Sequence, residues 1–593
     1  MNTNASKRFE ILTLFEKGQS ERLLKLDKIL LLGLTLIYAV IALLNLGTLS
    51  FPTTVYRGAV GDSCTLVFEE EVEIDEVWFN GNIAQGTLIL RGDDETEEEY
   101  TQDQGDMFTW NKVDMYFDTR TLQLTVEDRS VALNEIAFFS NGELLSVRAG
   151  DAGAKKMVDE QDTVPESPTY FNGMIFDEIY HARTAYENIH NLSVYEWTHP
   201  PLGKLIIALG ILIFGMKPFG WRIMGALFGV AMVPLMYVFA KRIFKRTDYA
   251  FITAGLWAFD CMHFTQTRIA TIDVYGVFFI LLMFFFMYEY VRQDYFTTPI
   301  RKKLKPLALS GVAFGLGCAS KWIGCYAGAG LAVVLFYHLF SAMFTAYKGH
   351  DKGAVERRSL FWDRLWITAG WCCLWFLLVP GLIYFGSYFP YYRYEASVRP
   401  GYGLRDMWDT LIKNQKDMYS YHSQLKATHL CQSMWYQWPF TFKSVWFYVS
   451  SYGTKISNIS STGNPAVWWI SAVGALCLFL EWVLGKVKKD PVLPILFIGV
   501  TANYLPWVLV TRCVFLYHFF ATVPFILLST VYLFFLLEQE NRKIYWIKWA
   551  WLGLAVVYFV LLYPAISGLP TGMGYAGFLE NVLPASLLYY GRV

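Results

Sequence analysis

The sequence predicts a polytopic α-helical membrane protein that carries a small extracytoplasmic β domain. The first reason is composition: 54% of the 593 residues are hydrophobic and 18% are aromatic, which is more apolar than soluble domains are. The second is a series of about eleven apolar runs, each close to the roughly 20 residues that span a bilayer. The third is the segment 51–150, where charge and turn signals replace the apolar runs. The formal net charge of -1 shows no excess of basic residues of the kind that binds nucleic acid, so no nucleic-acid partner is predicted.

The apolar runs predict the order of the membrane spans. They begin near residues 29, 219, 249, 274, 307, 327, 365, 465, 491, 513 and 545. The first run, 29–47, follows a charged tail, 1–28, and no small-residue cleavage site comes after it, so we interpret it as a retained transmembrane helix. Lys and Arg cluster after alternate runs, which predicts a multi-pass protein of the cell (plasma) membrane with a cytoplasmic N-terminus and an outside C-terminus. Two long segments, 48–218 and 388–464, then lie outside.

Residues 51–150 predict a β-sandwich or jelly roll, because short alternating segments separated by turn signals indicate half-buried strands. The segments include 72–79 and 121–126, and the turn signals include Asn80-Gly81 and Asn141-Gly142. The segment 132–139 resembles the closing strand of galactose-binding-like jelly rolls. That likeness favours a carbohydrate- or acceptor-binding module, and a lid or packing domain is the alternative.

Two further segments complete the first outside region. The acidic run 93–99 predicts a solvated hairpin tip, with a calcium site as the alternative. Residues 151–169 contain Gly, Asp, Glu and two prolines, which predicts a linker. The main helical domain is expected from residue 170 to residue 593.

Asp177 and Glu178 are the candidate catalytic residues, because carboxylates beside a bilayer are costly unless they have a function. Apolar residues around them recur at spacings of four and three, which predicts an amphipathic helix lying on the membrane surface. These apolar residues are Ile175, Ile179, Ala182, Tyr186 and Ile189. Asp177 and His181 are four residues apart and therefore lie next to each other on one face of the predicted helix. A carboxylate at this depth can act as a general base toward a hydroxyl acceptor, and a capping or ion-pairing role is the alternative.

Three cations stand in predicted outside turns, against the usual bias of membrane proteins: Arg268, Lys321 and Arg512. Isolated cations at the bilayer surface suit a phosphate, to which Arg offers paired hydrogen bonds and Lys a point charge. Snorkelling or pairing with lipid headgroups is the alternative for each of them. Asp273 follows Arg268 in the same turn, and His518 follows Arg512.

The second outside segment, 388–464, is rich in aromatic residues and contains His422, His429 and Trp435. Rings with polar tips suit the membrane interface and sugar faces, so we expect substrate hydrogen bonding or proton transfer here, with interfacial packing as the alternative. Neither histidine has a carboxylate or Cys partner at a suitable spacing, so no metal site is predicted. The nine cysteines of the chain show no paired spacing and are interpreted as buried structural thiols.

Several sequence pieces occur in one order between about residues 170 and 520. They are Phe176-Asp177-Glu178, His199-Pro200-Pro201-Leu202-Gly203-Lys204, Arg268 to Asp273, Ser320 to Gly324, Tyr421-His422 with His429, Gly463-Asn464-Pro465, and Arg512 to His518. With these pieces in this order, the chain resembles the protein O-mannosyltransferase family of GT-C membrane glycosyltransferases. The resemblance implies that 170–593 is a GT-C catalytic domain. Such a domain transfers a sugar, usually mannose, with inversion from a polyprenyl-phosphate carrier to Ser or Thr hydroxyls of exported proteins.

The same resemblance implies roles for individual residues. Asp177 would be the base, and Glu178 would orient the site and pair with Arg268. The carrier phosphate would be held by Arg268, Lys321 and Arg512. Contacts to the sugar or the acceptor would come from His181, His199, Asp273, His422, His429, Trp435, Tyr517 and His518. The polyprenyl-phosphate sugar is the expected donor, no further cofactor and no divalent metal are expected, and the expected partners are the bilayer, the exported protein acceptor and the secretion machinery.

Two departures from the family pattern shape these expectations. The second outside segment lacks the β-trefoil insert of fungal and animal members, and His429-Leu430-Cys431 stands where bacterial relatives tend to read His-Pro-Tyr. A bacterial-type member with its own acceptor contacts is the interpretation that follows. The alternatives are a GT-C transferase that decorates a lipid or cell-wall glycan, a transporter, and a surface protein whose β domain does the binding. The sequence shows no internal repeat of the kind that many transporters carry.

Overall fold

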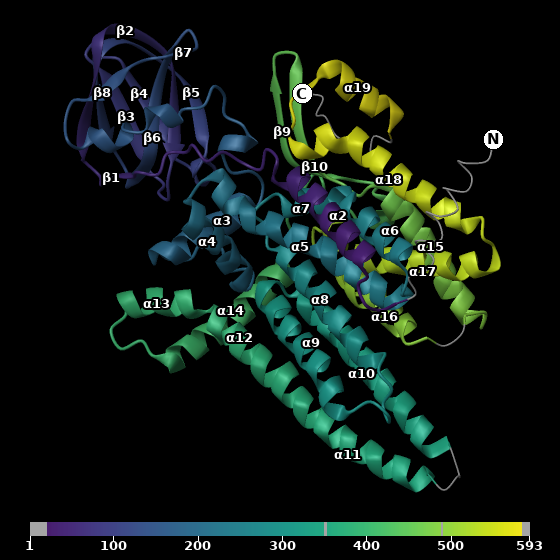
Figure 1. Ribbon diagram of the computed structural model, residues 1–593. Helices are drawn as coiled ribbons and strands as arrows, with labels where there is room; N and C mark the ends of the chain where they lie inside the picture. Colours follow the sequence, from purple (N-terminus) through teal and green to yellow (C-terminus); the bar gives the residue numbers. More distant parts are fainter. Residues whose placement is uncertain (1–19, 349–352, 488–489, 584–593) are drawn as a thin grey trace, which may run out of the picture. The chain divides into compact units, whose positions relative to one another are not determined.

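The computed structural model describes residues 20–348, 353–487 and 490–583 (Figure 1). It forms two compact units, which are described one at a time. The β unit consists of Asn45–Tyr186 and Ile207–Met224, and the helical unit holds the other described residues. Most of the predicted cytoplasmic tail, 1–28, lies outside the described residues. Three helices contribute residues to both units: α3 (Glu178–His190), α4 (Leu202–Phe214) and α5 (Pro218–Phe244).

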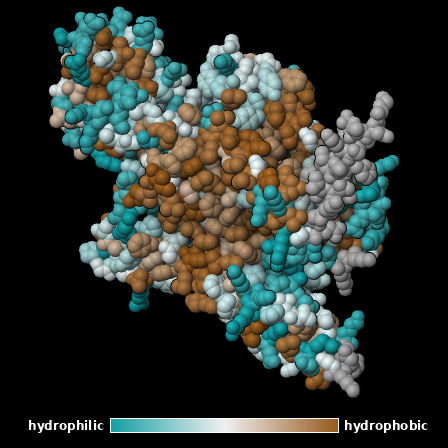
Figure 2. Space-filling model, in the orientation of Figure 1, coloured by the Kyte–Doolittle hydropathy of each residue, from teal (hydrophilic) through white to brown (hydrophobic). Residues whose placement is uncertain are grey.

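Nine helical stretches in the described part of the chain are long and apolar enough to cross a membrane. They are α2 (Lys25–Leu43), α5, α8 (Asp273–Val291), α10 (Ile323–Lys348), α11 to α12 (Ala354–Ser387), α15 (Pro465–Val483), α16 with its following turn (Val492–Leu509), α17 (Val523–Glu540) and α18 (Ile544–Ser567). Figure 2 shows apolar side chains over much of the visible face of these helices, as expected where lipid replaces water. These helices confirm a polytopic membrane protein.

The two remaining predicted spans have a different form. The run near 249 is divided between α6 (Thr247–Ala258) and α7 (Cys261–Thr267). The run near 307 is α9 (Ile300–Ser320), a helix of 21 residues with several cations in its first two turns. Helix α6 is too short to span a bilayer, and the first turns of α9 are rich in charged residues. The total of eleven spans therefore stays a prediction.

The break between α6 and α7 explains one of the sequence pieces. The Asp260 carboxylate caps α7 by accepting a hydrogen bond from the backbone N–H of His263 at 3.0 Å, and it also accepts the indole N–H of Trp468 at 2.8 Å. The Asn464 side-chain amide donates to the carbonyls of Phe259 and Ala555, both at 2.8 Å. A Cβ on Gly463 would lie only 2.3 Å from the Trp468 ring. The Gly463-Asn464-Pro465 piece therefore fastens a broken helix to α15.

The β unit contains one eight-stranded antiparallel sheet with the strand order β1-β6-β2-β5-β3-β4, to which β7 adds on β6 and β8 on β2. The strands are β1 (Tyr56–Gly58), β2 (Ser63–Gly81), β3 (Thr87–Gly92), β4 (Glu97–Thr101), β5 (Trp110–Val126), β6 (Val131–Ser140), β7 (Glu143–Leu144) and β8 (Val147–Ala149). Register shifts in the β2–β5 pair mark bulges, which let these long strands bend around one apolar core. The sheet domain is thus present, while its jelly-roll topology stays a prediction.

Three local predictions can be placed on this sheet. The predicted closing strand, 132–139, lies within β6, whose side chains are buried along nearly its whole length. Asn141 and Gly142 both have positive φ, at 50° and 81°, as a tight hairpin turn requires. The acidic run 93–99 forms the β3–β4 hairpin. The segment 151–169 also belongs to this unit, because Ala154 and Met157 are buried in its core.

The second outside segment, 388–464, is structured rather than an open loop. It contains α13 (Phe389–Val398), α14 (Leu404–Gln424), β9 (Val445–Tyr452) and β10 (Lys455–Ser461). The last two strands form a small antiparallel sheet with β11 (Thr571–Gly572), which is followed by α19 (Met573–Val582). This sheet brings the segment next to the end of α18, since Ser457 donates a hydrogen bond to the carbonyl of Gly568 at 2.6 Å.

The interpretation of the cysteines as buried structural thiols is wrong for Cys325, Cys373 and Cys477, which are exposed. All three lie in helical stretches long and apolar enough to cross a membrane. A thiol behaves as a small hydrophobe, so Cys373 and Cys477 need no protein cover where a helix surface faces lipid, whereas Cys325 lies in the first turn of α10, beside Lys321.

Candidate active site

The Asp177 turn begins α3 in the β unit. Phe176 has a φ of 49°, the left-handed region that a bulky residue rarely occupies, and this conformation reverses the chain just before Asp177. The Asp177 carbonyl then accepts the N–H groups of Tyr180 and His181, both at 3.1 Å, which starts the helix. The Asp177 side chain is half-buried at this amino end, where the helix dipole favours a negative charge. An ionised carboxylate in this position can accept a proton.

Glu178 is held by a second arginine that the sequence analysis did not single out. The carboxylate of Glu178 receives two hydrogen bonds from Arg222, at 2.7 and 2.6 Å, and both side chains are at least 99% buried. Arg222 also donates to the carbonyls of Leu46, Tyr170 and Gly173, at 3.0, 2.7 and 2.9 Å. All the N–H groups of the guanidinium are therefore used. The pair fixes the residues on both sides of the Asp177 turn, which agrees with an orienting role for Glu178.

The expected partner of Glu178, Arg268, makes a different set of contacts in the helical unit. Its Nη1 donates to three carbonyls at the carboxyl end of α2, those of Ile41, Ala42 and Leu44, at 3.1, 3.3 and 2.7 Å. The guanidinium also lies 4.8 Å over the ring of Phe264. A cation at this end of a helix is stabilised by the unpaired carbonyls. Arg222 is thus a bidentate partner of Glu178 that the sequence did not reveal, and both the pairing of Glu178 with Arg268 and a phosphate-binding role for Arg268 stay predictions.

Lys321 lies in the turn between α9 and α10 and is paired with Asp273. The two charged atoms are 2.6 Å apart, and both residues are more than 90% buried. Asp273 is the first residue of α8, so the pair joins two turns that are 48 residues apart in the chain. An ammonium group has three donors, and Asp273 occupies one of them. Lys321 can therefore keep this partner and still donate to a phosphate.

His199 belongs to a compact polar group around Glu196, another residue that the sequence analysis missed. The Glu196 carboxylate accepts from His199 Nδ1 at 3.0 Å and forms an ion pair with the fully buried Lys204. Lys204 also donates to the carbonyls of Glu196 and His199, at 2.7 and 3.0 Å. These contacts hold the His-Pro-Pro turn in one conformation. An acidic residue three positions before the histidine was the only signal available in the sequence.

His422, on α14, lies against His199, with ring centroids 5.1 Å apart. Its Nε2 is 2.9 Å from the carbonyl of Thr198 and therefore carries the proton. The Nδ1 atom is buried and has no hydrogen-bond partner among the described residues. Burial lowers the pKa of His422 to about 4, and the nearby charges of Arg512 and Lys321 act in the same direction. His422 is thus a neutral ring that offers a lone pair to a hydroxyl.

His518 completes this group of neutral histidines. Burial holds its pKa well below the usual range, with further lowering by Lys321 and Arg512. Its ring stacks on the buried Trp438, with centroids 6.0 Å apart and an interplanar angle of 16°. Burial also lowers the pKa of His199, an effect that Lys321 reinforces and Glu196 opposes. Lys321 acts on all three rings and Arg512 on those of His422 and His518, so the two cations and the three histidines form one cluster, called the electropositive cluster below, with Asp273 and Glu196 at its edge.

Arg512 is the cation of this cluster that is open to a ligand. Its side chain is half-buried, and its Nη1 donates a hydrogen bond to the carbonyl of Cys513 at 3.1 Å. It makes no ion pair with another residue in the described ranges. Tyr517 stacks on His518 at 4.7 Å, and its ring centroid is 5.9 Å from Lys321 Nζ. The cluster therefore presents one paired cation, one unpaired cation and aromatic walls.

The other predicted contact residues lie farther from these charges or in the other unit. His429 is exposed, accepts from the N–H of Cys431 at 3.0 Å and packs on Phe515. Trp435 is half-buried, and its carbonyl accepts the hydroxyl of Tyr504 at 2.9 Å. His181 is buried in the first turns of α3, in the β unit. Their roles toward a substrate stay predictions.

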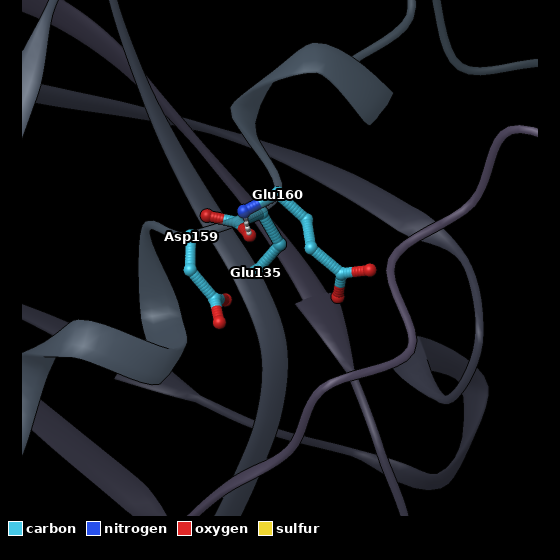
Figure 3. Close-up of side chains that lie close together, drawn as sticks. All are labelled: Glu135, Asp159 and Glu160. Atoms are coloured by element: carbon cyan, nitrogen blue, oxygen red, sulfur yellow. Dashed lines mark hydrogen bonds between the residues drawn. The ribbon is translucent and has the colours of Figure 1, made fainter.

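One group of carboxylates in the described residues has the spacing of a metal site: Glu135, Asp159 and Glu160 in the β unit. Figure 3 shows the three side chains close together, and one carboxylate oxygen of each lies within 4.8 Å of those of the other two. The Glu135 carboxylate accepts from Glu160 N–H and the Gln161 amide, both at 2.7 Å, and burial raises its pKa to about 8. Glu160 accepts the N–H groups of Thr53 and Thr54, both at 2.7 Å. These hydrogen bonds from protein donors account for the group of carboxylates, because they hold segment 151–169 against β6.

Comparison with known proteins decides the family. Residues 213–391 match the sequence model described as dolichyl-phosphate-mannose-protein mannosyltransferase, and residues 407–576 match that of the C-terminal four TMM region of protein-O-mannosyltransferase. The chain belongs to the protein O-mannosyltransferase family. The first match contains Arg268, Asp273 and Lys321, and the second contains His422 and Arg512. The family resemblance expected from the sequence pieces is confirmed.

Bacterial proteins are among the relatives of this mannosyltransferase family member. The polyprenol-phosphate-mannose–protein mannosyltransferase of Mycolicibacterium smegmatis is 27% identical over 469 residues, which are 68% of this chain and 86% of the relative. That of Mycobacterium tuberculosis is 26% identical over 465 residues, which are 67% and 83%. The protein O-mannosyltransferase complex of S. cerevisiae bound to the sugar donor superimposes with a TM-score of 0.56 at 14% identity, covering 71% of this chain and 90% of that one. This likeness supports the GT-C fold.

Proposed function

We propose that this protein is a polyprenyl-phosphate-mannose-dependent protein O-mannosyltransferase that acts on the extracytoplasmic face of the cell membrane. The family membership carries the general activity, which is transfer of a sugar from a lipid carrier to a protein. The single observation that supports the site is the electropositive cluster of Lys321, Arg512 and three neutral histidines in the helical unit. These residues lie within the regions that match the family or in the turn just before them.

The two cations suit the carrier phosphate, which is the leaving group. Arg512 has no ion-pair partner among the described residues and offers two parallel N–H donors, the geometry that phosphate oxygens accept. Lys321 adds a point charge, held in place by Asp273 at 2.6 Å. Negative charge grows on the phosphate as its bond to the sugar breaks, so fixed cations beside it stabilise the transition state. Binding of the ground-state phosphodiester gains less, because that group carries one charge fewer.

Asp177 is the proposed base. It removes the proton from the acceptor hydroxyl while the hydroxyl oxygen attacks the anomeric carbon from the side opposite the phosphate. The new carbon–oxygen bond forms as the bond to the phosphate oxygen breaks, which inverts the configuration, and the polyprenyl phosphate leaves as an anion. Arg222 and Glu178 fasten the turn that carries Asp177. No covalent enzyme intermediate and no metal ion are needed for this sequence of steps.

His422 is proposed to recognise a hydroxyl of the sugar or the acceptor. Its buried Nδ1 carries a lone pair, and leaving such an atom without a partner costs roughly 1–3 kcal/mol. A substrate hydroxyl would relieve this cost. His199 lies against it and is neutral for the same physical reason, burial. Histidines that stay uncharged leave the phosphate charge to Lys321 and Arg512 alone.

The test uses the purified full-length protein in nanodiscs with radiolabelled polyprenyl-phosphate mannose and a Ser/Thr-rich peptide. The comparison is wild type, Asp177→Asn and the control Asp162→Asn, which changes an exposed carboxylate in segment 151–169. Label on the peptide with wild type and the control, but not with Asp177→Asn, supports both the activity and the base. Equal label with Asp177→Asn removes Asp177 from that role. Donor binding without label in any variant points to a lipid or cell-wall glycan acceptor instead.

A further inference from the structure

Two Gly-Cys pairs flank the turn that carries Lys321. Gly317-Cys318 lies near the end of α9, which stops at Ser320, and Gly324-Cys325 lies at the start of α10, which begins at Ile323. The sulfur atoms of Cys318 and Cys325 are 3.5 Å apart. The chain reverses between them, so residues seven positions apart face each other across the turn.

The short distance between the thiols follows from the backbone. A Cβ on Gly324 would lie 2.7 Å from the backbone nitrogen of Cys318 and 2.7 Å from the carbonyl carbon of Gly317. Any other residue at 324 would therefore force the two helix ends apart. The absence of a side chain lets the backbones touch, and the cysteine that follows each glycine is carried into contact with the other. The proximity is thus built into the helix ends rather than into one side-chain rotamer.

The two thiols also differ in access as a disulfide-exchange pair requires. Cys325 is exposed, whereas Cys318 is 7% exposed. Disulfide exchange begins when an accessible thiolate attacks an external disulfide, and it ends when a second thiol resolves the mixed disulfide. A disulfide bond is about 2.05 Å long, so the sulfurs must approach by roughly 1.5 Å, which small side-chain rotations supply.

We propose that Cys318 and Cys325 form a reversible disulfide that clamps the turn holding Lys321. The Cys325 thiolate attacks a small-molecule or protein disulfide, forms a mixed disulfide and releases one thiol. The Cys318 thiolate then attacks the Cys325 sulfur, closes the Cys318–Cys325 bond and releases the second thiol. The cysteines lose two electrons and two protons, and the external disulfide takes up both to become two thiols.

Formation of this disulfide in cells rests on the proposed function, which places the Lys321 turn outside the cell membrane. An outside location of the Lys321 turn exposes the thiols to an oxidising compartment, where disulfides persist. The chemistry of the pair itself does not depend on sugar transfer. The two ideas can therefore fail separately, and the experiment has one arm for each.

The first arm oxidises the purified full-length protein with oxidised glutathione. Trypsin cuts after Lys321 and separates the two cysteines onto peptides 304–321 and 322–348. We expect the two peptides to stay linked, at a mass lower by two hydrogen atoms, until a reductant separates them. Cys318→Ser and Cys325→Ser should each abolish the link, whereas Cys477→Ser, which removes an exposed cysteine elsewhere, should leave it intact. No link in the wild type, or a link that survives either serine variant, overturns the proposal.

The second arm traps thiols in intact cells with acid and N-ethylmaleimide before the protein is purified. Linked peptides from the cells support the disulfide in its native membrane. Recovery of Cys318 and Cys325 both modified by N-ethylmaleimide would overturn the disulfide in the native membrane. If the same protein nevertheless links with glutathione after purification, the Lys321 turn faces a reducing compartment, which contradicts the proposed outside active site while leaving the sugar-transfer assay unaffected.

Discussion

Replacement of Arg222 by methionine tests the role of the buried Arg222–Glu178 pair. The side chain length is kept, but Glu178 then remains fully buried without the two hydrogen bonds from Arg222. Removal of one partner of a buried ion pair costs about 3–5 kcal/mol, because the remaining charge has lost both water and its counter-ion. The carbonyls of Leu46, Tyr170 and Gly173 lose their donor as well, so the upper end of this range is expected.

The measurement is thermal unfolding of the protein in nanodiscs, followed by a probe in the β unit. For a domain of this size, 1 kcal/mol corresponds to about 2–4 °C, so Tm should fall by roughly 6–20 °C. Peptide mannosylation should fall too, because the Asp177 turn loses its anchor. The double variant Arg222→Met with Glu178→Met removes the stranded charge and should recover much of the Tm but not the activity. An unchanged Tm in the single variant, or full activity in either variant, refutes this reasoning.

Three further predictions concern other parts of the molecule. Lys321→Ala and Arg512→Ala should each lower kcat/KM for the donor by about 10–150-fold, the value of a charged hydrogen bond of about 1.5–3 kcal/mol, and unchanged donor kinetics would exclude phosphate binding there. Burial raises the pKa of Glu135 to about 8, so the folded β unit binds the proton more tightly than the unfolded chain does. The contribution of Glu135 to the stability of the β unit should therefore be fully present below pH 4.5 and be lost as pH rises toward 8, and Glu135→Gln should remove this contribution in a pH series of Tm. Asn464→Ala should lower Tm through lost hydrogen bonds to the broken helix and the α15 cap, while Asn541→Ala, at an exposed turn, should not.

Features that depend on neighbouring residues could be predicted from the sequence. The apolar runs located most of the membrane helices, because hydropathy is a sum over consecutive side chains. The β domain was visible as well, since alternation and turn residues such as Asn141-Gly142 describe single hairpins. Asp177 was singled out because a carboxylate in an apolar amphipathic segment stands out without any knowledge of what surrounds it, and its role as the base stays a prediction.

Pairings across the fold could not be predicted in this way. The family resemblance implied a pair of Glu178 with Arg268, which stays a prediction, whereas the bidentate pair of Glu178 with Arg222 was not foreseen. Arg222 carried one signal, a charge within a membrane helix, but that signal does not name a partner. Lys321 was expected to be a lone cation and is joined to Asp273, 48 residues away.

The sequence by itself therefore determined the class of protein, the order of its membrane helices, the presence of a β domain and the family. The tertiary structure alone decided which charges neutralise each other and which remain available to a ligand. The same holds for Cys318 and Cys325, whose spacing of seven residues carries no meaning until a helix break at Lys321 folds one onto the other. The physical reason is range: hydropathy and backbone preference act between neighbours in the chain, whereas ion pairing, desolvation and thiol contact depend on atoms that only packing brings together.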